Sequence, residues 1–439
     1  MEVTRTEQFR IGKNSEYWKI IDDLAWKSKN VYNSGNYIIR QEFFKTSKEK
    51  EAGLRDHANW IRYKELDKML QGMDCYKELT SQSSQATLKA LDKNWKSFFA
   101  SVKDYSKHPE KYTGRPKLPR YKNTKTGREQ VRIKNNQCRM KDGYIYFSWT
   151  PLKPLNNHFK SIYPNDRIFA ARFKIRNHDY ILEVIHELEI PEIEAKGNRI
   201  AAIDIGVDNL ATVVSNCGIP PFAINGKPLK SINHYYNKNL ASLKSDLKIK
   251  TGKNHSNRIN SLTAKRNRKV DDYMHKASKI IVDWCMQNQI DTLVLGHNEG
   301  WKQECKLGNE HNKKDTNRAN QNFVCIPFNS LIEKLAYKCE NVGITFIERE
   351  EAYTSGTSFL DSEPPTKKFY DKSRRIHRGM FVANDGTEIN ADVNAAYQIL
   401  RKAFPDKEIV CDRETGLHPV IITPDSPNDE AKTASKVAV

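Results

Sequence analysis

Two aspartates that lie far apart in the chain, Asp204 and Asp392, stand where folded acids could carry out metal chemistry. Asp204 follows the apolar run of residues 200–203 and precedes Gly206, so we expect it at the end of a buried strand. A carboxylate in that place is costly unless it is paired or binds a cation. Asp392 stands in the first turn of a predicted helix whose apolar stripe includes Leu400. Together the two acids suggest a metal site that the fold assembles.

Each aspartate also has a simpler explanation. Asp392 could serve only to begin its helix, where the helix dipole favours a carboxylate, and Asp204 could belong to a capped turn. Metal chemistry would use both residues, because two divalent ions about 3.5–4 Å apart activate water and stabilise the leaving oxygen of a phosphodiester. Carboxylates supply the oxygen ligands that Mg²⁺ prefers. In such a site both aspartates would be metal ligands.

Several segments occur in an order that resembles a known family. They are IDIGVDNLATV around Asp204, YTS at residues 353–355 and ADVNAA around Asp392. Upstream, SQSSQATLKALDKNWKSFF and GRPKLPRYK extend the match, which covers most of residues 80–402. The ordered set resembles TnpB proteins, which are transposon-encoded, RNA-guided relatives of the compact type V CRISPR effectors.

The resemblance implies both a fold and an activity. It implies an α/β multidomain protein whose RuvC-like nuclease domain has an RNase H-like sheet, preceded by a helical recognition lobe and a small β-barrel, the wedge domain. The activity implied is RNA-guided, metal-dependent cleavage of double-stranded DNA next to a short motif that the protein reads. The cofactor would be Mg²⁺ or Mn²⁺, and the partners would be a guide RNA and a DNA duplex in the prokaryotic cytoplasm.

One expected acid is missing. In most relatives a glutamate ends the strand that spans residues 292–295 here, and this chain has Gly296 in that place. Cleavage could have been lost, which would leave an RNA-guided DNA-binding protein such as a repressor. Alternatively, an acid from a neighbouring strand could take over, because neighbouring strands lie about 4.8 Å apart.

A neighbouring acid is available after the strand of residues 344–347. Period-2 alternation puts Glu351 on the same face as Ile347 and puts Glu348 and Glu350 on the other. We therefore expect Asp204, Glu351 and Asp392 to be the catalytic and metal-binding acids, with Glu350 as the alternative third acid. Glu299 and Glu304, in a predicted loop beyond Gly296, are less favoured, and any of these glutamates could be an ordinary surface charge.

A second departure from the family concerns zinc. Relatives often carry two Cys-x-x-Cys pairs between the YTS and ADVNAA segments. Here Ser358 and Asp361 occupy the places of the first pair, and Ala383 and Asp385 fall near the second. The eight cysteines of the chain form no Cys-x-x-Cys pair, so neither a zinc site nor a disulfide framework is expected.

The charge of the chain points to an anionic partner. Its 439 residues include 73 Lys and Arg against 54 Asp and Glu, a formal net charge of +19. Nucleic acid fits best, because no apolar run approaches the length of a membrane span and no signal-peptide pattern occurs. Whether the protein is a monomer or a dimer is left open.

The hydrophobic pattern predicts a strand, a helical region, a group of short strands and an α/β region in that order, and the resemblance implies which domain of the family each one forms. Residues 1–12 would form the first wedge strand, 13–113 the helical recognition lobe and 114–196 the wedge β-barrel. Residues 197–403 would form the nuclease domain, with a basic insertion at 356–389 that lacks the zinc cysteines, and residues 404–439 a flexible tail. Within the recognition lobe, a stripe of large apolar residues from Leu88 to Phe99 predicts a buried helical face.

Three basic segments are candidates for nucleic-acid contact, although each could be an ordinary solvated surface. One is an extended linker with two prolines, one is a long helix and one is the basic insertion. The residues concerned are Arg115, Lys117, Arg120, Lys122, Arg266, Arg268, Lys269, Lys276, Arg374 and Arg375.

A third interpretation of the chain, besides a nuclease and a nuclease-dead DNA-binding protein, is a guide-independent transposase. With a single-strand mechanism, such a transposase would need a His-x-His metal pair, which does not occur in the sequence.

Overall fold

The computed structural model describes residues 1–190, 197–298, 323–377 and 379–424. The chain divides into two compact units, one formed by residues 2–189 and the other by residues 190–439 with Met1. Each unit has its own hydrophobic core.

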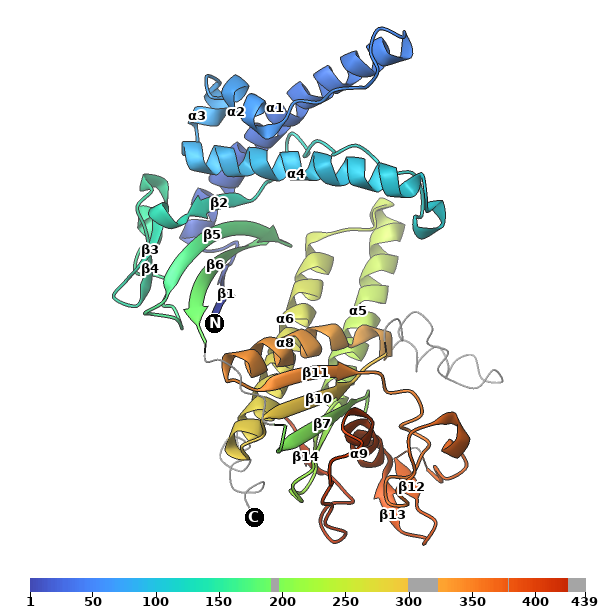
Figure 1. The fold of residues 1–439 in the computed structure, drawn as a ribbon. Helices are drawn as coiled ribbons and strands as arrows, with labels where there is room; N and C mark the ends of the chain where they lie inside the picture. Colours follow the sequence, from blue (N-terminus) through green and yellow to red (C-terminus); the bar gives the residue numbers. More distant parts are fainter. Residues whose placement is uncertain (191–196, 299–322, 378, 425–439) are drawn as a thin grey trace. The chain divides into compact units, whose positions relative to one another are not determined.

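The first unit contains a helical group (Figure 1). Its helices are α1 (Glu16–Glu51), α2 (Tyr63–Leu70), α3 (Asp74–Lys77) and α4 (Ser81–Tyr105). The predicted apolar face of α4 is buried at Leu88, Leu91 and Trp95. α1 packs closely against it at Gly35, where an added Cβ would lie 2.9 Å from Leu88 Cδ2. The large apolar stripe is therefore core, as predicted.

The first unit also contains an antiparallel sheet of order β1-β6-β5-β2. Its strands are β1 (Glu2–Ile11), β2 (Val131–Lys134), β5 (Arg167–Arg176) and β6 (Asp179–Glu189). A separate hairpin pairs β3 (Cys138–Lys141) with β4 (Tyr144–Phe147). The described strands form an open sheet, so the expected β-barrel is not seen among them. The buried residues of this sheet and of the helices belong to a single hydrophobic core. The predicted boundary between residues 113 and 114 therefore does not separate two cores.

The second unit is an α/β layer structure built on a mixed sheet of order β11-β10-β7-β8-β9-β14. β7, β10 and β11 run parallel to one another, and β8 is antiparallel to β7 and β9. The strands are β7 (Ile200–Ile205), β8 (Asn209–Ser215), β9 (Phe222–Asn225), β10 (Thr292–Gly296), β11 (Thr345–Arg349) and β14 (Val420–Ile422). The predicted α/β class is confirmed.

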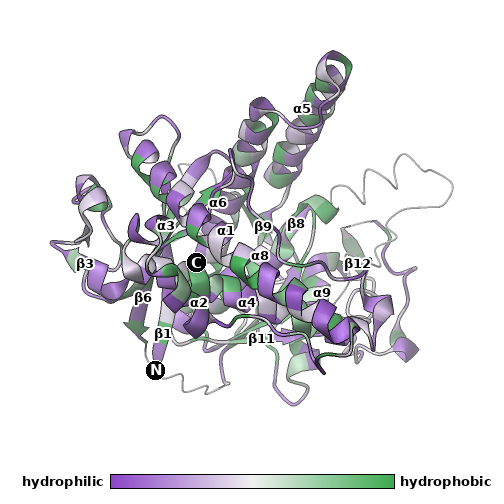
Figure 2. Cartoon of the chain, turned by 90° about the horizontal axis from the view of Figure 1, so that it is seen from above, coloured by the Kyte–Doolittle hydropathy of each residue, from purple (hydrophilic) through white to green (hydrophobic). Residues whose placement is uncertain are grey.

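Helices cover both faces of this sheet (Figure 1). They are α6 (Asn257–Gln287), α8 (Phe328–Asn341) and α9 (Ala391–Ala403), whereas α5 (Lys227–Thr251) packs against α6. On β7, Ala201 and Ile203 share a core with α6 and α8, whereas Ile200 and Ala202 share a core with α9. By the same alternation Asp204 faces α9. The hydropathy colours of Figure 2 show α5 and α6 as helices with mixed polar and apolar surfaces.

The C-terminal part differs from the expectation. Residues 404–439 were expected to form a flexible tail, but β14 pairs in parallel with β9, and Val420 lies opposite Phe222. Only three residues form this strand, too few for a periodic signal. The insertion contains a 3-10 turn (Lys367–Phe369) and a two-stranded sheet of β12 (Met380–Val382) and β13 (Glu388–Asn390).

Candidate metal site and nucleic-acid contacts

Asp204 and Asp392 come from facing elements of the second unit. Asp204 lies near the end of β7 on the face that α9 covers, and Asp392 lies in the first turn of α9. Asn390 caps this helix, because its Oδ1 accepts hydrogen bonds from the backbone N–H groups of Asp392 (3.0 Å) and Val393 (3.2 Å). Asn209, the first residue of β8, donates from Nδ2 to Oδ2 of Asp392 at 2.8 Å. The Asp392 carboxylate is thus oriented by a neighbouring strand.

Glu351 lies where a side chain of residue 296 would otherwise project. In the parallel register Leu295 is opposite Ile203, so the next residues along the two strands are Gly296 and Asp204. A Cβ atom added to Gly296 would lie 3.2 Å from Oε2 of Glu351 and 2.4 Å from Cδ1 of Ile399 on α9. A side chain at this position would force the buried Ile399 to shift. The Glu351 carboxylate therefore lies over the strand end that lacks its own acid.

Asn298 holds Glu351 at two points. Its Oδ1 accepts a hydrogen bond from the Glu351 backbone N–H at 3.1 Å, and its Nδ2 donates to Glu351 Oε1 at 3.4 Å. The carbonyl oxygen of Glu351 accepts hydrogen bonds from the backbone N–H (3.2 Å) and the hydroxyl (2.8 Å) of Thr354. The residue is therefore fixed by its backbone as well as by its side chain.

The other candidate glutamates are directed elsewhere. Glu350, the alternative third acid, is exposed and pairs with Lys402 at 3.1 Å. Glu348 is exposed and lies 3.4 Å from His297 Nδ1. Glu299 and Glu304 lie outside the described residues. Among the described glutamates after β10, Glu351 is the one whose carboxylate is shown beside Gly296.

Two of the three acids have raised pKa values. Burial raises the pKa of Asp204 well above its usual range, and the nearby Asp392 and Glu351 raise this pKa further, while Arg375 partly opposes them. Burial also raises the pKa of Glu351, to about 7, against a lowering influence from Lys402. Both effects disfavour the ionised acids unless a cation compensates their charge.

The donor set fits a hard divalent cation. Carboxylate oxygens oriented by side-chain amides are suitable ligands and outer partners for Mg²⁺. Among the described residues, however, no three Asp, Glu, His or Cys side chains converge closely enough to hold an ion. Asp392 and Glu351 thus raise the pKa of Asp204, but within the described residues the three acids do not form a closed set of ligands.

An ionic network links the two places where relatives carry cysteine pairs. The Arg374 guanidinium donates to Asp361, to Glu363 at 2.8 Å and to the Val382 carbonyl at 3.0 Å. The Asp361 carboxylate also accepts hydrogen bonds from the Asn384 backbone N–H at 3.0 and 3.2 Å. This network therefore joins the two loops. Arg374, expected to guide a nucleic-acid strand, is committed to this network.

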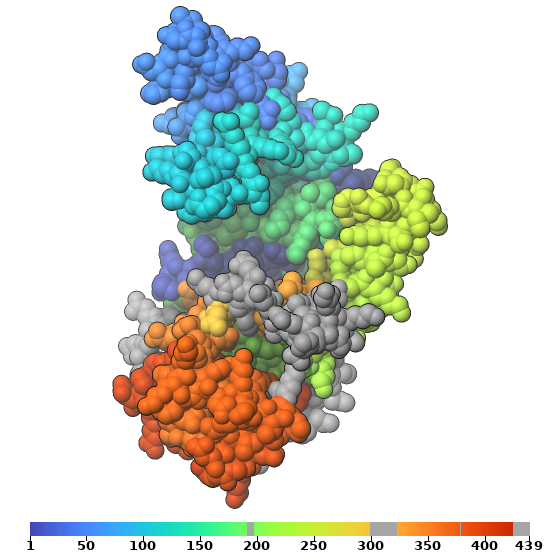
Figure 3. All heavy atoms as spheres, turned by 90° about the vertical axis from the view of Figure 1, so that its right-hand side faces the viewer, coloured from blue at the N-terminus to red at the C-terminus, as the bar shows by residue number. Residues whose placement is uncertain are grey.

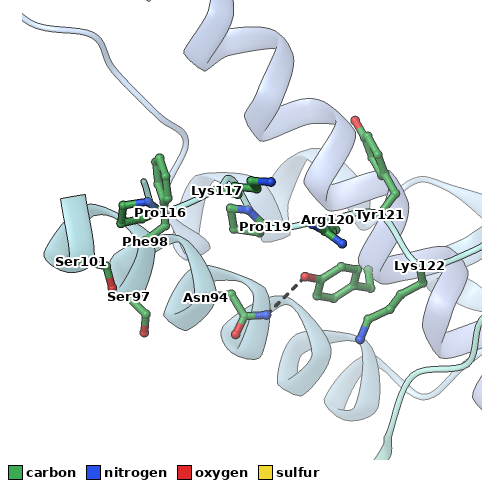
Figure 4. A pocket seen from close by; sticks show the side chains of 11 residues that line it. Asn94, Ser97, Phe98, Ser101, Pro116, Lys117, Pro119, Arg120, Tyr121 and Lys122 are labelled. Atoms are coloured by element: carbon green, nitrogen blue, oxygen red, sulfur yellow. Dashed lines mark hydrogen bonds between the residues drawn. The ribbon is translucent and has the colours of Figure 1, made fainter. Parts of the chain in front are cut away.

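A groove in the first unit contains part of the basic linker (Figure 4). It has a volume of about 400 Å³ and lies between the polar face of α4, with Asn94 and Ser97, and the extended segment of residues 116–122. Lys117 and Arg120 line it, are exposed, and form no ion pair within the described part of the chain. They are available to an anion.

The linker is held rigidly by α1. Asn36 donates to the Pro119 carbonyl at 3.0 Å, and Arg40 donates to the same oxygen at 2.5 Å. Asn33 exchanges two hydrogen bonds of 2.9 Å with the backbone of Lys122. The Lys122 ammonium pairs with a glutamate at 2.9 Å, so it is less available than its neighbours. Arg115, also in this segment, is exposed but does not line the groove.

Some candidate cations of the second unit are bound within the protein, and others are exposed. Arg266 donates to Asn233 Oδ1 at 2.8 Å and to the Cys325 carbonyl at 2.7 Å, so it supports the fold. Lys276 pairs with an aspartate one turn away at 2.9 Å. Arg268 and Lys269 are exposed on α6, and Arg375 is close enough to Asp204 to lower its pKa. Lys269 and Arg375 remain the better candidates.

Two residues that orient the acids were not identified from the sequence. Asn209 lies within the IDIGVDNLATV segment, five residues after Asp204, and Asn298 lies two residues after Gly296. An asparagine near a strand end is a weak signal, because this residue type is also common in turns. Their partners come from distant segments, which only the fold brings near.

Two protein-family models match separate parts of the chain. The OrfB_IS605 model, described as a probable transposase, matches residues 183–302, and the model of the Cas12f1-like TNB domain matches residues 328–399. The TnpB-like protein ORF457 of Acidianus two-tailed virus is 22% identical over 443 residues. The match covers 91% of this chain and 86% of that protein.

The chain also matches solved structures at low identity. A Cas12f1–sgRNA–target DNA complex matches with 17% identity and a TM-score of 0.34, covering 90% of this chain and 98% of the other. A mini RNA-guided endonuclease, CRISPR-Cas phi3, matches with 10% identity and a TM-score of 0.45, covering 94% of each chain.

Within the described residues, none of the helices is both long and apolar enough to span a membrane.

Proposed function

The resemblance to TnpB proteins and compact type V CRISPR effectors is confirmed by these sequence matches, and on that basis we propose that the chain is an RNA-guided, metal-dependent DNA endonuclease. Its second unit would be the RuvC-like, RNase H-like nuclease domain. Its partners would be a guide RNA and a double-stranded DNA target in the prokaryotic cytoplasm. Guide pairing would read the sequence, and the protein would read a short adjacent motif.

The observation that carries the proposal is the position of Glu351. Its carboxylate lies over Gly296, next to the strand end that carries Asp204, where relatives place a glutamate of their own. A chain without metal chemistry would have no reason to keep a buried acid there, because burial disfavours its ionised form. The substitution of one acid by another from the neighbouring strand supports an active nuclease.

Each residue of the site has a proposed role. Bound Mg²⁺ or Mn²⁺ would activate water and stabilise the leaving oxygen of the phosphodiester. Asp204, Glu351 and Asp392 would be the ligands. Asn209 fixes the Asp392 carboxylate and Asn298 fixes Glu351, so the ligand side chains are oriented before they bind. No zinc is needed, because the Arg374 network joins the loops that cysteine pairs join in relatives.

The basic groove of the first unit would contact the nucleic-acid backbone. Lys117 and Arg120 are exposed cations on a segment whose backbone is fixed by α1, so little backbone entropy would be lost when they bind phosphate. Such contacts position a duplex but carry no sequence information themselves. We assign these two residues to the positioning of nucleic acid.

The test begins with the purified protein and the nucleic acid that accompanies it. RNA bound to the protein is sequenced, and a plasmid that carries the complementary target is then incubated with the complex and Mg²⁺. Linearisation by the unmodified protein but not by Asp204→Ala supports the proposal. RNA binding without cleavage would indicate the nuclease-dead DNA-binding alternative, and the absence of bound RNA would favour a guide-independent transposase.

A further inference from the structure

The helical hairpin formed by α5 and α6 is a strongly basic part of the second unit. From Lys238 to Lys269 the sequence contains ten Lys and Arg residues and one acid, Asp246. Among the residues of α5, only Leu229 and Asn233 near its first turns are buried. Figure 3 shows the atoms of this hairpin, in yellow-green, exposed toward the viewer. This excess of positive charge suits a polyanion rather than a small ligand.

A pocket lies between the two helices within this basic region. Its volume is about 380 Å³, at the lower end of the range of roughly 300–1,000 Å³ that is usual for ligand pockets. Tyr235 of α5 lines it with 63% of its surface exposed. Lys265 and Lys269 of α6 also line it, are exposed, and form no ion pair in the described ranges. An aromatic face and two cations therefore border one hollow.

Two other residues that line the pocket, Tyr236 and Arg266, are held by contacts inside the protein. The hydroxyl groups of Tyr236 and Thr263 are hydrogen-bonded to each other at 3.1 Å. The Arg266 guanidinium lies 5.7 Å from the centroid of the Tyr236 ring and is itself held by Asn233 Oδ1 at 2.8 Å. Because Tyr236 and Arg266 are held in this way, the pocket has its shape before a ligand binds.

We propose that this pocket binds one unpaired nucleotide of a nucleic-acid strand, whose base stacks on Tyr235 and whose phosphates contact Lys265 and Lys269. The exposed ring requires a base with a free face, which a stacked duplex does not offer. The other hairpin cations would follow the adjoining phosphates. The inference rests on the proposed function only in taking nucleic acid as the ligand. The unpaired strand can come from the guide RNA or from the displaced DNA strand.

The experiment uses the full chain and photoreactive oligonucleotides. Single strands of RNA with 4-thiouridine, single strands of DNA with 4-thiothymidine and a blunt DNA duplex are crosslinked to the protein, and the labelled peptides are identified by mass spectrometry. We expect single strands to label the peptide that contains Tyr235. Tyr235→Leu should reduce this labelling and weaken binding about tenfold, whereas the matched control Tyr235→Phe, which keeps the ring, should preserve both.

The lysines give a second readout. Replacement of both Lys265 and Lys269 by alanine should make the slope of log K against log salt shallower by about 1.4 for single strands. Preferential labelling by RNA would identify the guide as the source, and preferential labelling by DNA would identify the displaced strand. Equal labelling of Tyr235→Leu and Tyr235→Phe, or equal labelling by the duplex, would overturn the inference. Failure of the protein to bind any nucleic acid would instead overturn the proposed function.

Discussion

Glu351 and Gly296 form a complementary pair, in which the carboxylate of one residue occupies the space left by the missing side chain of the other. The Cβ position of residue 296 lies 3.2 Å from Glu351 Oε2. The same position lies 2.4 Å from Ile399 Cδ1, so the helix that carries Asp392 packs directly over this glycine. Glu351 and Asp392, two of the proposed metal ligands, are thereby linked through the packing at Gly296.

Gly296→Ala should destabilise the protein even though it adds a single methyl group. Overpacking against Ile399 should cost about 1–3 kcal/mol of unfolding free energy. Ile399→Val removes the clashing Cδ1 atom, so the double variant should be more stable than the sum of the two single changes predicts. Urea unfolding measures the free energy of unfolding of the unmodified protein, the two single variants and the double variant. Strict additivity would show that the two residues do not contact each other.

Asn298→Ala should reduce cleavage more than it reduces stability. The variant loses two hydrogen bonds to Glu351, each of which contributes about 1 kcal/mol, and leaves the Glu351 carboxylate free to turn away. We expect a decrease of about tenfold in the single-turnover cleavage rate. Asn384→Ala, in the Arg374 network, is the control. A decrease in Tm without any change in cleavage rate would contradict the assigned role of Asn298.

The acidic site should make stability depend on pH when divalent cations are removed. The pKa of Glu351 is raised in the folded protein, to about 7, so its contribution to stability is fully present below the unfolded pKa of about 4.5. That contribution is lost as the pH rises through about 7. We therefore subtract the Tm of the unmodified protein from that of Glu351→Gln with EDTA present. This difference should be larger at pH 8 than at pH 6.

Mg²⁺ should act in the opposite sense. Because it binds the ionised carboxylates and competes with protons, its stabilisation of the unmodified protein should be larger at pH 8 than at pH 6. Thermal unfolding with Mg²⁺ or EDTA measures this difference. An equal Mg²⁺ effect at both pH values, or an equal effect on Asp204→Asn, would show that the ion does not bind these acids.

The Arg374 network should stabilise the insertion in place of zinc. Arg374→Ala leaves Asp361 and Glu363 half-buried without their cation, which should cost about 2–4 kcal/mol. Arg374→Lys should rescue little, since a single ammonium group cannot reproduce the forked contacts. Tm values of these variants test the prediction. A fall in the Tm of the unmodified protein on treatment with a zinc-selective chelator would contradict it.

Much of the second unit follows from local sequence patterns. The apolar run before Asp204 and the stripe after Asp392 predicted β7 and α9, and period-2 alternation distinguished Glu351 from Glu350. Alternation succeeds here because it depends only on which face of a strand a residue occupies. The clash between Gly296 and Ile399 could not be predicted, since it depends on how closely α9 packs on the sheet.

Other features lacked a periodic signal. The helix α5 was not predicted, because few of its residues are buried and its surface is mostly polar. Its ends were nevertheless marked by Pro228 in the first turn and by Gly252, whose φ of +66° ends the helix in the left-handed region. The hydrogen bonds that Arg374 and Arg266 make inside the protein could not be predicted either. The sequence does not distinguish a basic residue with internal contacts from one that binds nucleic acid.

The most direct test of the central claim compares two neighbouring glutamates. The complex with its bound RNA is assayed for Mg²⁺-dependent plasmid cleavage as the unmodified protein, as Glu351→Gln and as Glu350→Gln. Glu351→Gln should cleave at least about a hundredfold more slowly because a metal ligand is lost, whereas Glu350→Gln, which loses only an exposed ion pair, should stay within about threefold of the unmodified rate. Full cleavage by Glu351→Gln, or a loss confined to Glu350→Gln, would contradict the assignment of Glu351 as the replacement acid.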